Sequence, residues 1–412
     1  MSFNRSTKQF GRVLHLVAVV LLTSNMPTAF ADAPIRVGIL HSLSGTMAVS
    51  EVTLKDVMLM LIDQQNEDGG LLGRKLEPVV LDPASNWSLY AEKARQLIER
   101  EKVAVIFGCW TSSSRKSVLP VVENLNRLLF YPVQYEGQEQ SPNIFYLGAA
   151  PNQQAIPAVE FLLKQRGIER WILVGTDYVY PRTINSVLVA HLMNRGVEKS
   201  EIMLSYTPFG HTGWQRIVEE IKGFASQGRK TAVISTINGD ANLAFYRELS
   251  LQGIEADDIP VLAFSVGEEE LTNMEIGPLE GHLAAWNYFM SVDSAENDAF
   301  INDWRKFTGD ATRVTNDPME AYVIGFEMWV RAVEQAGTIA TDEVREALIG
   351  MRVSNLSGGI AEMLPNHHIS RPAYVGQIRA DGQYDIIWQS AGSIKGAPWS
   401  PYLKRARDGA VQ

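Results

Sequence analysis

The stretch VAVIFGCWTSSSRKSVLPVVE, Val103–Glu123, predicts the unit from which the fold is built. Its first five residues form an apolar run that ends at Gly108, a pattern typical of a buried strand. Hydroxyl side chains at 111–114 follow, and apolar residues at 118, 119, 121 and 122 predict a helix. The start of such a helix presents backbone N–H groups that suit a ligand carbonyl or anion. The alternative is an ordinary helix cap beside a core tryptophan, Trp110.

The same alternation of strand and helix recurs on both sides of this stretch. Strands are expected at Ile35–Leu40, Leu76–Leu81, Leu128–Tyr131 and Ile144–Leu147, with helices at Leu54–Asn66 and Leu89–Glu101. A second run begins after Pro151, with strands at Trp171–Gly175, Glu201–Tyr206, Ala232–Thr236 and Val261–Ser265. We therefore expect an α/β protein of two lobes, each a parallel sheet covered by helices on both faces. Later helices, such as Pro318–Ala336, and the strands Ala373–Arg379 and Tyr384–Gln389 are expected to complete these lobes.

The N-terminal residues have the features of a cleaved secretory signal. Arg5, Lys8 and Arg12 precede the apolar run Val13–Leu22, and small residues at 29 and 31 fit the signal peptidase pattern. The run is too short to span a bilayer. Removal of Met1–Ala31 takes away three basic and no acidic residues, so the formal net charge changes from −10 to −13. An acidic, exported chain argues against nucleic-acid binding and fits a periplasmic location.

Ligands of open α/β sheets bind beyond the carboxyl ends of the strands, and this rule selects seven loops. They are Ser42–Thr46, Asp82–Trp87, Trp110–Ser114, Tyr131–Gly137, Asp177–Pro181, Asn238–Asp240 and Ser265–Glu270. These loops are rich in hydroxyls and aromatic rings and contain no Lys or Arg; the helical Arg115 and Lys116 lie just beyond one of them. Such a rim fits a small neutral or zwitterionic ligand better than a phosphate or an acid.

Motifs of catalysis are absent from the sequence. It contains no G-x-S-x-G, H-E-x-x-H or P-loop pattern, and no G-x-G-x-x-G after a strand. The adjacent His367 and His368 are more typical of structure than of metal ligation, and Cys109, the single cysteine, has no histidine near it in sequence. The run Glu268–Glu270 either caps a helix or turns one carboxylate toward a ligand. A binding protein is therefore favoured over an enzyme.

Ten segments of the chain resemble one family of binding proteins. They are GILHSLSGTMAVSE, QQNEDGGLLGRKLEPVVLD, FGCWTSSSRKSVLPVVE, FYPVQYEGQE, IFYLGAAPNQQ, GTDYVYPRT, INGDAN, AAWNYF, NDPMEAY and PNHHIS. On these segments the chain resembles type I periplasmic solute-binding proteins, and most closely the urea-binding components of bacterial urea ABC transporters. Short-chain amide receptors and branched-chain amino-acid receptors are relatives of that group. The resemblance implies permease and ATPase subunits as partners, no cofactor and no metal.

The resemblance also implies the domain organisation. It predicts two Rossmann-like lobes joined by three crossovers, near Ala149–Pro151, Ala285–Trp286 and Asn355–Pro372. The N-terminal lobe is then 33–149 with 286–355, and the C-terminal lobe is 150–285 with 372–395. Residues 399–412 are expected to form a loose tail.

The amide-sensing relatives supply the first part of the predicted site. Their ligand contacts lie on motifs that match Trp110, Ser112, Tyr131, Val133 and Tyr178. The relatives carry tyrosine at the first of these positions and threonine at the fourth. The resemblance therefore does not imply that this chain binds the same ligand as they do. In the branched-chain amino-acid receptors, hydroxyls that match 111–114 hold the α-carboxylate.

The chemistry of urea supplies the rest of the predicted site. Urea has one strong acceptor and four N–H donors, so a site for it needs donors such as those at Thr111 and several acceptors. The predicted acceptors and further contacts are Asp82, Asp177, Asn238, Ser265 and Glu269. A short-chain amide receptor, a branched-chain amino-acid receptor, a ligand-sensing regulator and a hydrolase remain as alternatives.

Overall fold

The computed structural model describes residues 1–2, 33–226 and 228–403. Apart from residues 1–2, the predicted signal Met1–Ala31 lies outside the described residues, as does 404–412 of the predicted tail. The chain divides into two units, Met1–Asp32 and Ala33–Gln412, and all the helices and strands described belong to the second. None of the described helices has the length and apolar character needed to cross a membrane.

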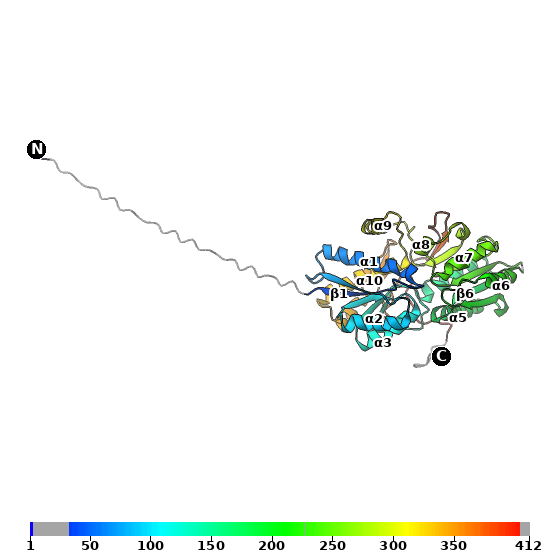
Figure 1. Ribbon diagram of the computed structural model, residues 1–412, viewed down its shortest axis with the longest axis horizontal. Helices are drawn as coiled ribbons and strands as arrows, with labels where there is room; N and C mark the ends of the chain where they lie inside the picture. The colour runs from blue at the N-terminus through cyan, green and yellow to red at the C-terminus, as the bar shows by residue number, and fades with distance from the viewer. Residues whose placement is uncertain (3–32, 227, 404–412) are drawn as a thin grey trace. The chain divides into compact units, whose positions relative to one another are not determined.

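The first sheet is parallel throughout, and its strands lie in the order β2-β1-β3-β4-β5 (Figure 1). Its strands are β1 (Ile35–Leu40), β2 (Leu76–Leu81), β3 (Val105–Gly108), β4 (Leu128–Tyr131) and β5 (Ile144–Tyr146). The connecting helices are α1 (Ala48–Glu67), α2 (Trp87–Glu99) and α3 (Ser112–Asn124). The predicted alternation is thus confirmed here, although α1 begins six residues before the predicted Leu54.

The second sheet has seven strands in the order β14-β13-β10-β9-β8-β6-β7. Five are parallel: β6 (Arg170–Thr176), β7 (Ile202–Thr207), β8 (Thr231–Thr236), β9 (Val261–Ala263) and β10 (Leu283–Trp286). The late strands β13 (Tyr374–Ile378) and β14 (Tyr384–Gln389) add to one edge in antiparallel fashion. The helices of this half are α4 (Ala155–Phe161), α5 (Val179–Asn194), α6 (Gln215–Ala225), α7 (Ala241–Leu251) and the short α8 (Glu268–Leu271).

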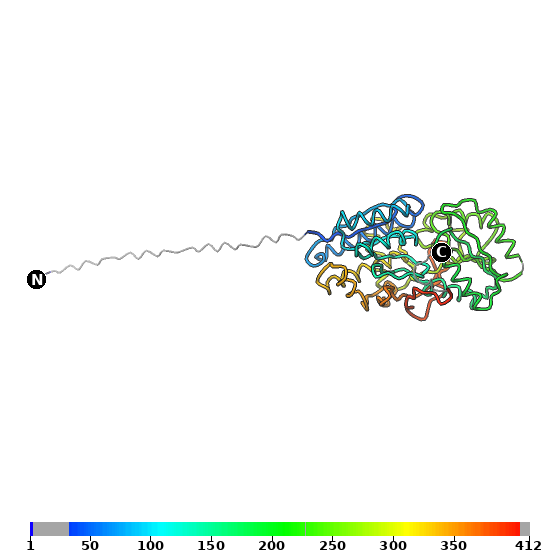
Figure 2. Tube along the Cα trace, turned by 90° about the horizontal axis from the view of Figure 1, so that it is seen from below, coloured from blue at the N-terminus to red at the C-terminus, as the bar shows by residue number. Residues whose placement is uncertain are grey.

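The late helices return to the first sheet. They are α9 (Ala295–Thr308), α10 (Asp317–Ala336) and α11 (Thr341–Leu348), followed by the small hairpin β11 (Arg352–Ser354) and β12 (Ile360–Glu362). Helix α10 packs against α1, and its Tyr322 and Trp329 rings meet Phe107 of β3 edge-on. Figure 2 shows these yellow and orange segments beside the blue N-terminal ones. The core of the first lobe is therefore built from segments more than 200 residues apart.

The predicted lobe boundaries stay a prediction, with two structural facts beside them. Trp286, expected at the second crossover, still pairs with Tyr374 in the second sheet, so the chain leaves that sheet at Asn287. The ring of Tyr402, in the expected tail, packs edge-on against His191 of α5.

Candidate functional site

The β3–α3 turn has the local structure that its sequence predicts. Cys109 has a left-handed backbone with φ 70°, and a Cβ on the preceding Gly108 would lie 2.6 Å from the Leu40 carbonyl oxygen, so the turn is tight. Thr111 is the N-cap of α3, and its hydroxyl accepts a hydrogen bond of 3.1 Å from the Ser114 backbone N–H. The predicted hydroxyl-rich helix start is therefore present at the carboxyl end of β3.

The hydroxyls at this helix start are already engaged within the chain. Ser112 donates to Glu136 Oε2 over 2.5 Å, and the Ser114 hydroxyl donates to the Thr111 carbonyl over 2.7 Å. A hydroxyl has one hydrogen to donate, so neither of these groups can also donate to a ligand without breaking its present bond. The prediction that this stretch supplies hydroxyl donors to a ligand is thus weakened, because the donors point into the protein.

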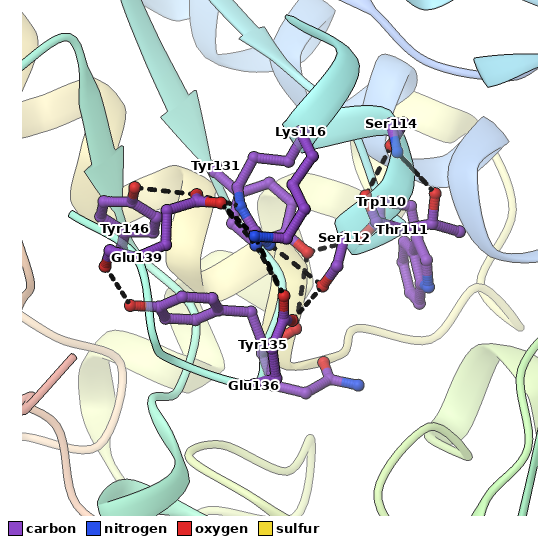
Figure 3. A network of polar contacts seen from close by, with 12 residues as sticks. Trp110, Thr111, Ser112, Ser114, Lys116, Tyr131, Tyr135, Glu136, Glu139 and Tyr146 are labelled. Carbon is purple, nitrogen blue, oxygen red and sulfur yellow. Dashed lines mark hydrogen bonds and ion pairs between the residues drawn. The ribbon is translucent and has the colours of Figure 1, made fainter. Parts of the chain in front are cut away.

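The reason is a buried ionic cluster that the sequence did not reveal. Arg115 is fully buried, and its guanidinium contacts Glu139 at 2.7 Å and Glu136 at 3.2 Å. Lys116 reaches Glu139 at 2.7 Å (Figure 3). Burial favours the neutral acid, but the two cations outweigh it and hold the pKa of Glu139 at about 2. Two positive and two negative groups compensate each other, so the cluster offers no free charge to a ligand.

Aromatic rings enclose this cluster and extend to the second lobe. The Arg115 guanidinium lies 4.8 Å from the Tyr131 ring centroid and 4.6 Å from that of Tyr135. The Tyr131 hydroxyl donates to the backbone carbonyl of Trp110 over 2.6 Å, and the indole lies to one side of the cluster (Figure 3). Tyr178, at the start of α5, is buried, and α5 packs against α3 across the boundary between the lobes. Three of the predicted ligand contacts, Trp110, Tyr131 and Tyr178, therefore lie along this boundary, and we call them the aromatic wall.

Gln134 connects the two lobes beside this wall. Its Nε2 donates to the Phe264 carbonyl over 2.7 Å and to the Ser265 hydroxyl oxygen over 3.1 Å. Because a carbonyl can only accept, the orientation of the amide is fixed and Oε1 faces the other way. Gln134 Oε1 is buried and has no hydrogen-bond partner among the described residues.

Tyr180 presents a second buried polar atom at the same place. Its hydroxyl neighbours the side chains of Gln134 and Ser265, and it forms no well-aligned hydrogen bond within the described part of the chain. The predicted loops Tyr131–Gly137 and Asp177–Pro181 contain Gln134 and Tyr180, but neither residue was singled out from the sequence. Of the predicted residues, Ser265 joins this group, and Val133, adjacent to Gln134, is buried beside it in the chain.

The predicted carboxylate acceptors are used elsewhere. Asp82 accepts from the backbone N–H groups of Leu43 and Ala84 and from a serine hydroxyl, and these bonds lower its pKa despite its partial burial. Asp177 is paired with Arg182 at 2.5 Å on the surface. Both carboxylates are therefore already paired within the chain and are poor acceptors for a ligand.

Glu269 and Asn238 also stand apart from the aromatic wall in the contacts that the structure shows. Glu269 is half-buried, faces Arg313, and has its pKa raised to about 7 by burial. Its neighbours Glu268 and Glu270 are the fully buried members of the run. Asn238 is buried after β8, where its Nδ2 donates to the Thr236 carbonyl over 3.2 Å.

Metal binding has no support in the described residues. Across 33–226 and 228–403, no group of three or more His, Cys, Asp and Glu side chains is arranged to hold an ion. His368 is instead hydrogen-bonded to the Tyr135 hydroxyl at 2.6 Å and to the Asn366 carbonyl at 2.7 Å. Since the carbonyl must accept, Nδ1 carries the proton and Nε2 accepts from the tyrosine.

Comparison with known proteins identifies a family that covers most of the chain, and two similar proteins. A family model described as "Periplasmic binding protein domain" matches residues 35–405. Leu/Ile/Val-binding protein homolog 6 of Brucella melitensis biotype 1 is 23% identical over 383 residues, covering 90% of this chain and 94% of that protein. Limonene hydroxylase of Geobacillus stearothermophilus is 30% identical over 118 residues, which are 29% of this chain and 21% of that protein.

Solved structures share the fold. A solute-binding protein of an ABC transporter from Rhodopseudomonas palustris HaA2, in complex with p-hydroxybenzoic acid, has a TM-score of 0.78 at 21% identity. The match covers 90% of this chain and 99% of that one. The branched-chain amino-acid transporter substrate-binding protein LivJ of Streptococcus pneumoniae, in complex with isoleucine, has a TM-score of 0.73 at 17% identity, covering 88% and 99%. At these levels of identity, the similarity shows a shared two-lobed fold.

Proposed function

The chain belongs to the periplasmic binding protein family, and from that premise we propose that it is the solute-binding component of an ABC importer whose ligand is urea. In this proposal the ligand lies between the lobes, against Trp110, Tyr131 and Tyr178. The protein then delivers it to permease and ATPase subunits and meets the membrane only through the permease. It acts in the periplasm, without a cofactor and without nucleic acid.

One observation carries the choice of ligand: Gln134 Oε1 and the Tyr180 hydroxyl are both buried where the lobes meet, and neither forms a well-aligned hydrogen bond within the described residues. An unsatisfied buried polar group costs roughly 1–3 kcal/mol, so a ligand that satisfies both atoms gains affinity. Gln134 Oε1 can only accept, whereas the Tyr180 hydroxyl can donate or accept. A planar amide, which has N–H donors beside a carbonyl acceptor, matches that pair.

The charge of the site favours a neutral ligand over an amino acid. A free cation or free hydroxyl donors would strengthen the binding of an α-carboxylate, but Arg115 is compensated by Glu136 and Glu139. The Ser112 hydroxyl also donates to Glu136. A small neutral ligand disturbs none of these contacts.

Two other ligand classes are supported by the names of similar proteins. Branched-chain amino acids are favoured by the Leu/Ile/Val-binding relatives and by the isoleucine complex, and aromatic acids by the p-hydroxybenzoic acid complex. Short aliphatic amides share the hydrogen-bonding groups of urea and are the nearest alternative to it. An enzyme is disfavoured, because no nucleophile and base are paired in the site as described.

Calorimetric titration of the purified mature chain with urea, acetamide, leucine and p-hydroxybenzoate tests the proposal. We expect saturable heat with urea and none with leucine or p-hydroxybenzoate. Heat with leucine alone would assign the protein to the amino-acid receptors, and heat with acetamide but not urea would assign it to the amide receptors. Incubation with urea should release no ammonia; release would establish a hydrolase.

A further inference from the structure

Three aromatic rings meet between the lobes on the outer side of Tyr180, and two of them, Trp87 and Phe209, are not among the predicted ligand contacts. Trp87 is the first residue of α2, in the first lobe, whereas Tyr178 and Phe209 follow β6 and β7 in the second. The Trp87 ring stacks on Tyr178 with a centroid separation of 6.5 Å and meets Phe209 edge-on at 5.8 Å. Tyr178 and Phe209 lie 4.9 Å apart. We call these three residues the aromatic clasp.

Trp87 is the outermost ring of the clasp. It is 39% exposed, whereas Tyr178 beneath it is 8% exposed. The Tyr178 ring in turn contacts the buried Tyr180 ring, with a centroid separation of 6.2 Å. The position of Trp87 is fixed by the start of its helix, because the Asn86 side chain caps α2 by accepting from the backbone N–H groups of Ser88 and Leu89. A residue at a capped helix start has its backbone fixed to its lobe, so separation of the lobes also separates the clasp.

We propose that Trp87 is the gate of the site: it limits the length of the ligand that the closed protein can hold and slows ligand release. This inference rests on the proposed function, since it takes the ligand to lie inward of Tyr178. Opening the lobes exposes the faces of three apolar rings to water, which is unfavourable. Ligand release requires that opening, so removing one ring is expected to accelerate release more than it changes association.

Kinetics of release provide the first test. Stopped-flow measurement on the full mature chain compares wild type, Trp87→Ala and, as the conservative control, Trp87→Phe. We expect the urea dissociation rate to rise about tenfold in Trp87→Ala, equivalent to about 1.4 kcal/mol, and to change little in Trp87→Phe. Butyramide should gain affinity relative to urea in Trp87→Ala, because the mouth no longer limits ligand length. Unchanged dissociation and unchanged relative affinity in Trp87→Ala would overturn the gate.

Cross-linking provides a second test that needs no ligand. The double variant Trp87→Cys with Phe209→Cys should react with a short thiol cross-linker faster than Trp87→Cys with Met193→Cys. Met193 is exposed near the far end of α5, about 20 Å along the helix from Tyr178 at 1.5 Å per residue. The native Cys109 is buried and does not compete.

The two tests separate failure of the gate from failure of the proposed function. If wild type binds neither urea nor butyramide, the proposed function is wrong, and the cross-linking rates still decide whether positions 87 and 209 meet. Equal cross-linking rates for the 87–209 and 87–193 pairs would overturn the gate whatever the ligand is. Faster reaction of the 87–209 pair, accelerated further by urea, would support both.

Discussion

Tyr180→Phe removes a buried hydroxyl that forms no well-aligned hydrogen bond within the described residues, and it leaves the ring in place. Because this hydroxyl lacks a well-aligned hydrogen bond, its removal should have opposite effects on the stability of the free protein and on its affinity for the ligand. In the absence of ligand, loss of an unsatisfied buried polar group should stabilise the fold by about 1 kcal/mol or more. In the complex, the ligand atom that would have met the hydroxyl is left unpaired, which costs roughly 1–3 kcal/mol of binding free energy. Affinity for urea should therefore fall by about fivefold to about a hundredfold.

Tyr246 offers a matched control on the same chain. Its hydroxyl is also buried without a hydrogen-bond partner among the described residues, but it lies on α7, away from the aromatic wall. Burial raises the pKa of Tyr246, so its hydroxyl stays protonated at neutral pH, as in Tyr180. Tyr246→Phe should give the same gain in stability and no change in affinity.

Two assays follow the two effects. Guanidinium unfolding measures the free energy of folding without adding urea, and calorimetry measures the dissociation constant for urea. The reasoning fails if Tyr180→Phe binds urea as tightly as wild type, or if Tyr246→Phe loses as much affinity. A loss of stability in both variants would show that these hydroxyls have partners, such as bound water, in solution.

Three further predictions concern stability. Glu139, whose pKa is lowered to about 2 by the two cations that face it, contributes stability above pH 4.5 that is lost as pH falls toward 2. Glu139→Gln should abolish this acid dependence, measured by thermal unfolding against pH. Glu268, whose pKa burial raises to about 8, should cost stability as pH rises from 4.5 to 8, by about 1.4 kcal/mol per pH unit, and Glu268→Gln should flatten that fall. Gly148→Ala places a Cβ 2.0 Å from the Val133 carbonyl carbon, so unfolding should show a loss of about 1–3 kcal/mol. Gly392→Ala, where nothing lies within 4 Å, should be close to neutral.

Local patterns accounted for much of the fold. Short apolar runs that end at glycines or polar loops predicted the nine parallel strands β1 to β9 within two residues, since a buried parallel strand needs continuous apolar residues. The late strands β13 and β14 were also predicted, within one residue at each end. The four-residue strand Leu283–Trp286 was not predicted, because so short an apolar run carries no period, and the second crossover was expected at its end, near Ala285–Trp286. The antiparallel direction of β13 and β14 was also not predictable, since strand order depends on contacts distant in sequence.

The candidate site was also predicted only in part. The sequence predicted the capped helix start at Thr111 and the aromatic residues Trp110, Tyr131 and Tyr178, because each depends on its neighbours along the chain or on the family resemblance. It did not predict that Ser112 donates to Glu136, 24 residues later, and so gives up its role as a free donor.

What the sequence alone determined is therefore the alternation of elements and the chemistry available at the strand ends. Only the tertiary structure decided which polar atoms are left without a partner. Gln134 and Tyr180 come from different lobes, and whether their oxygens are satisfied depends on how Ser265 and the Phe264 carbonyl approach them. Hydrogen bonding is short-ranged and directional, so the pairing of groups over 100 residues apart is set by packing and cannot be inferred from their spacing.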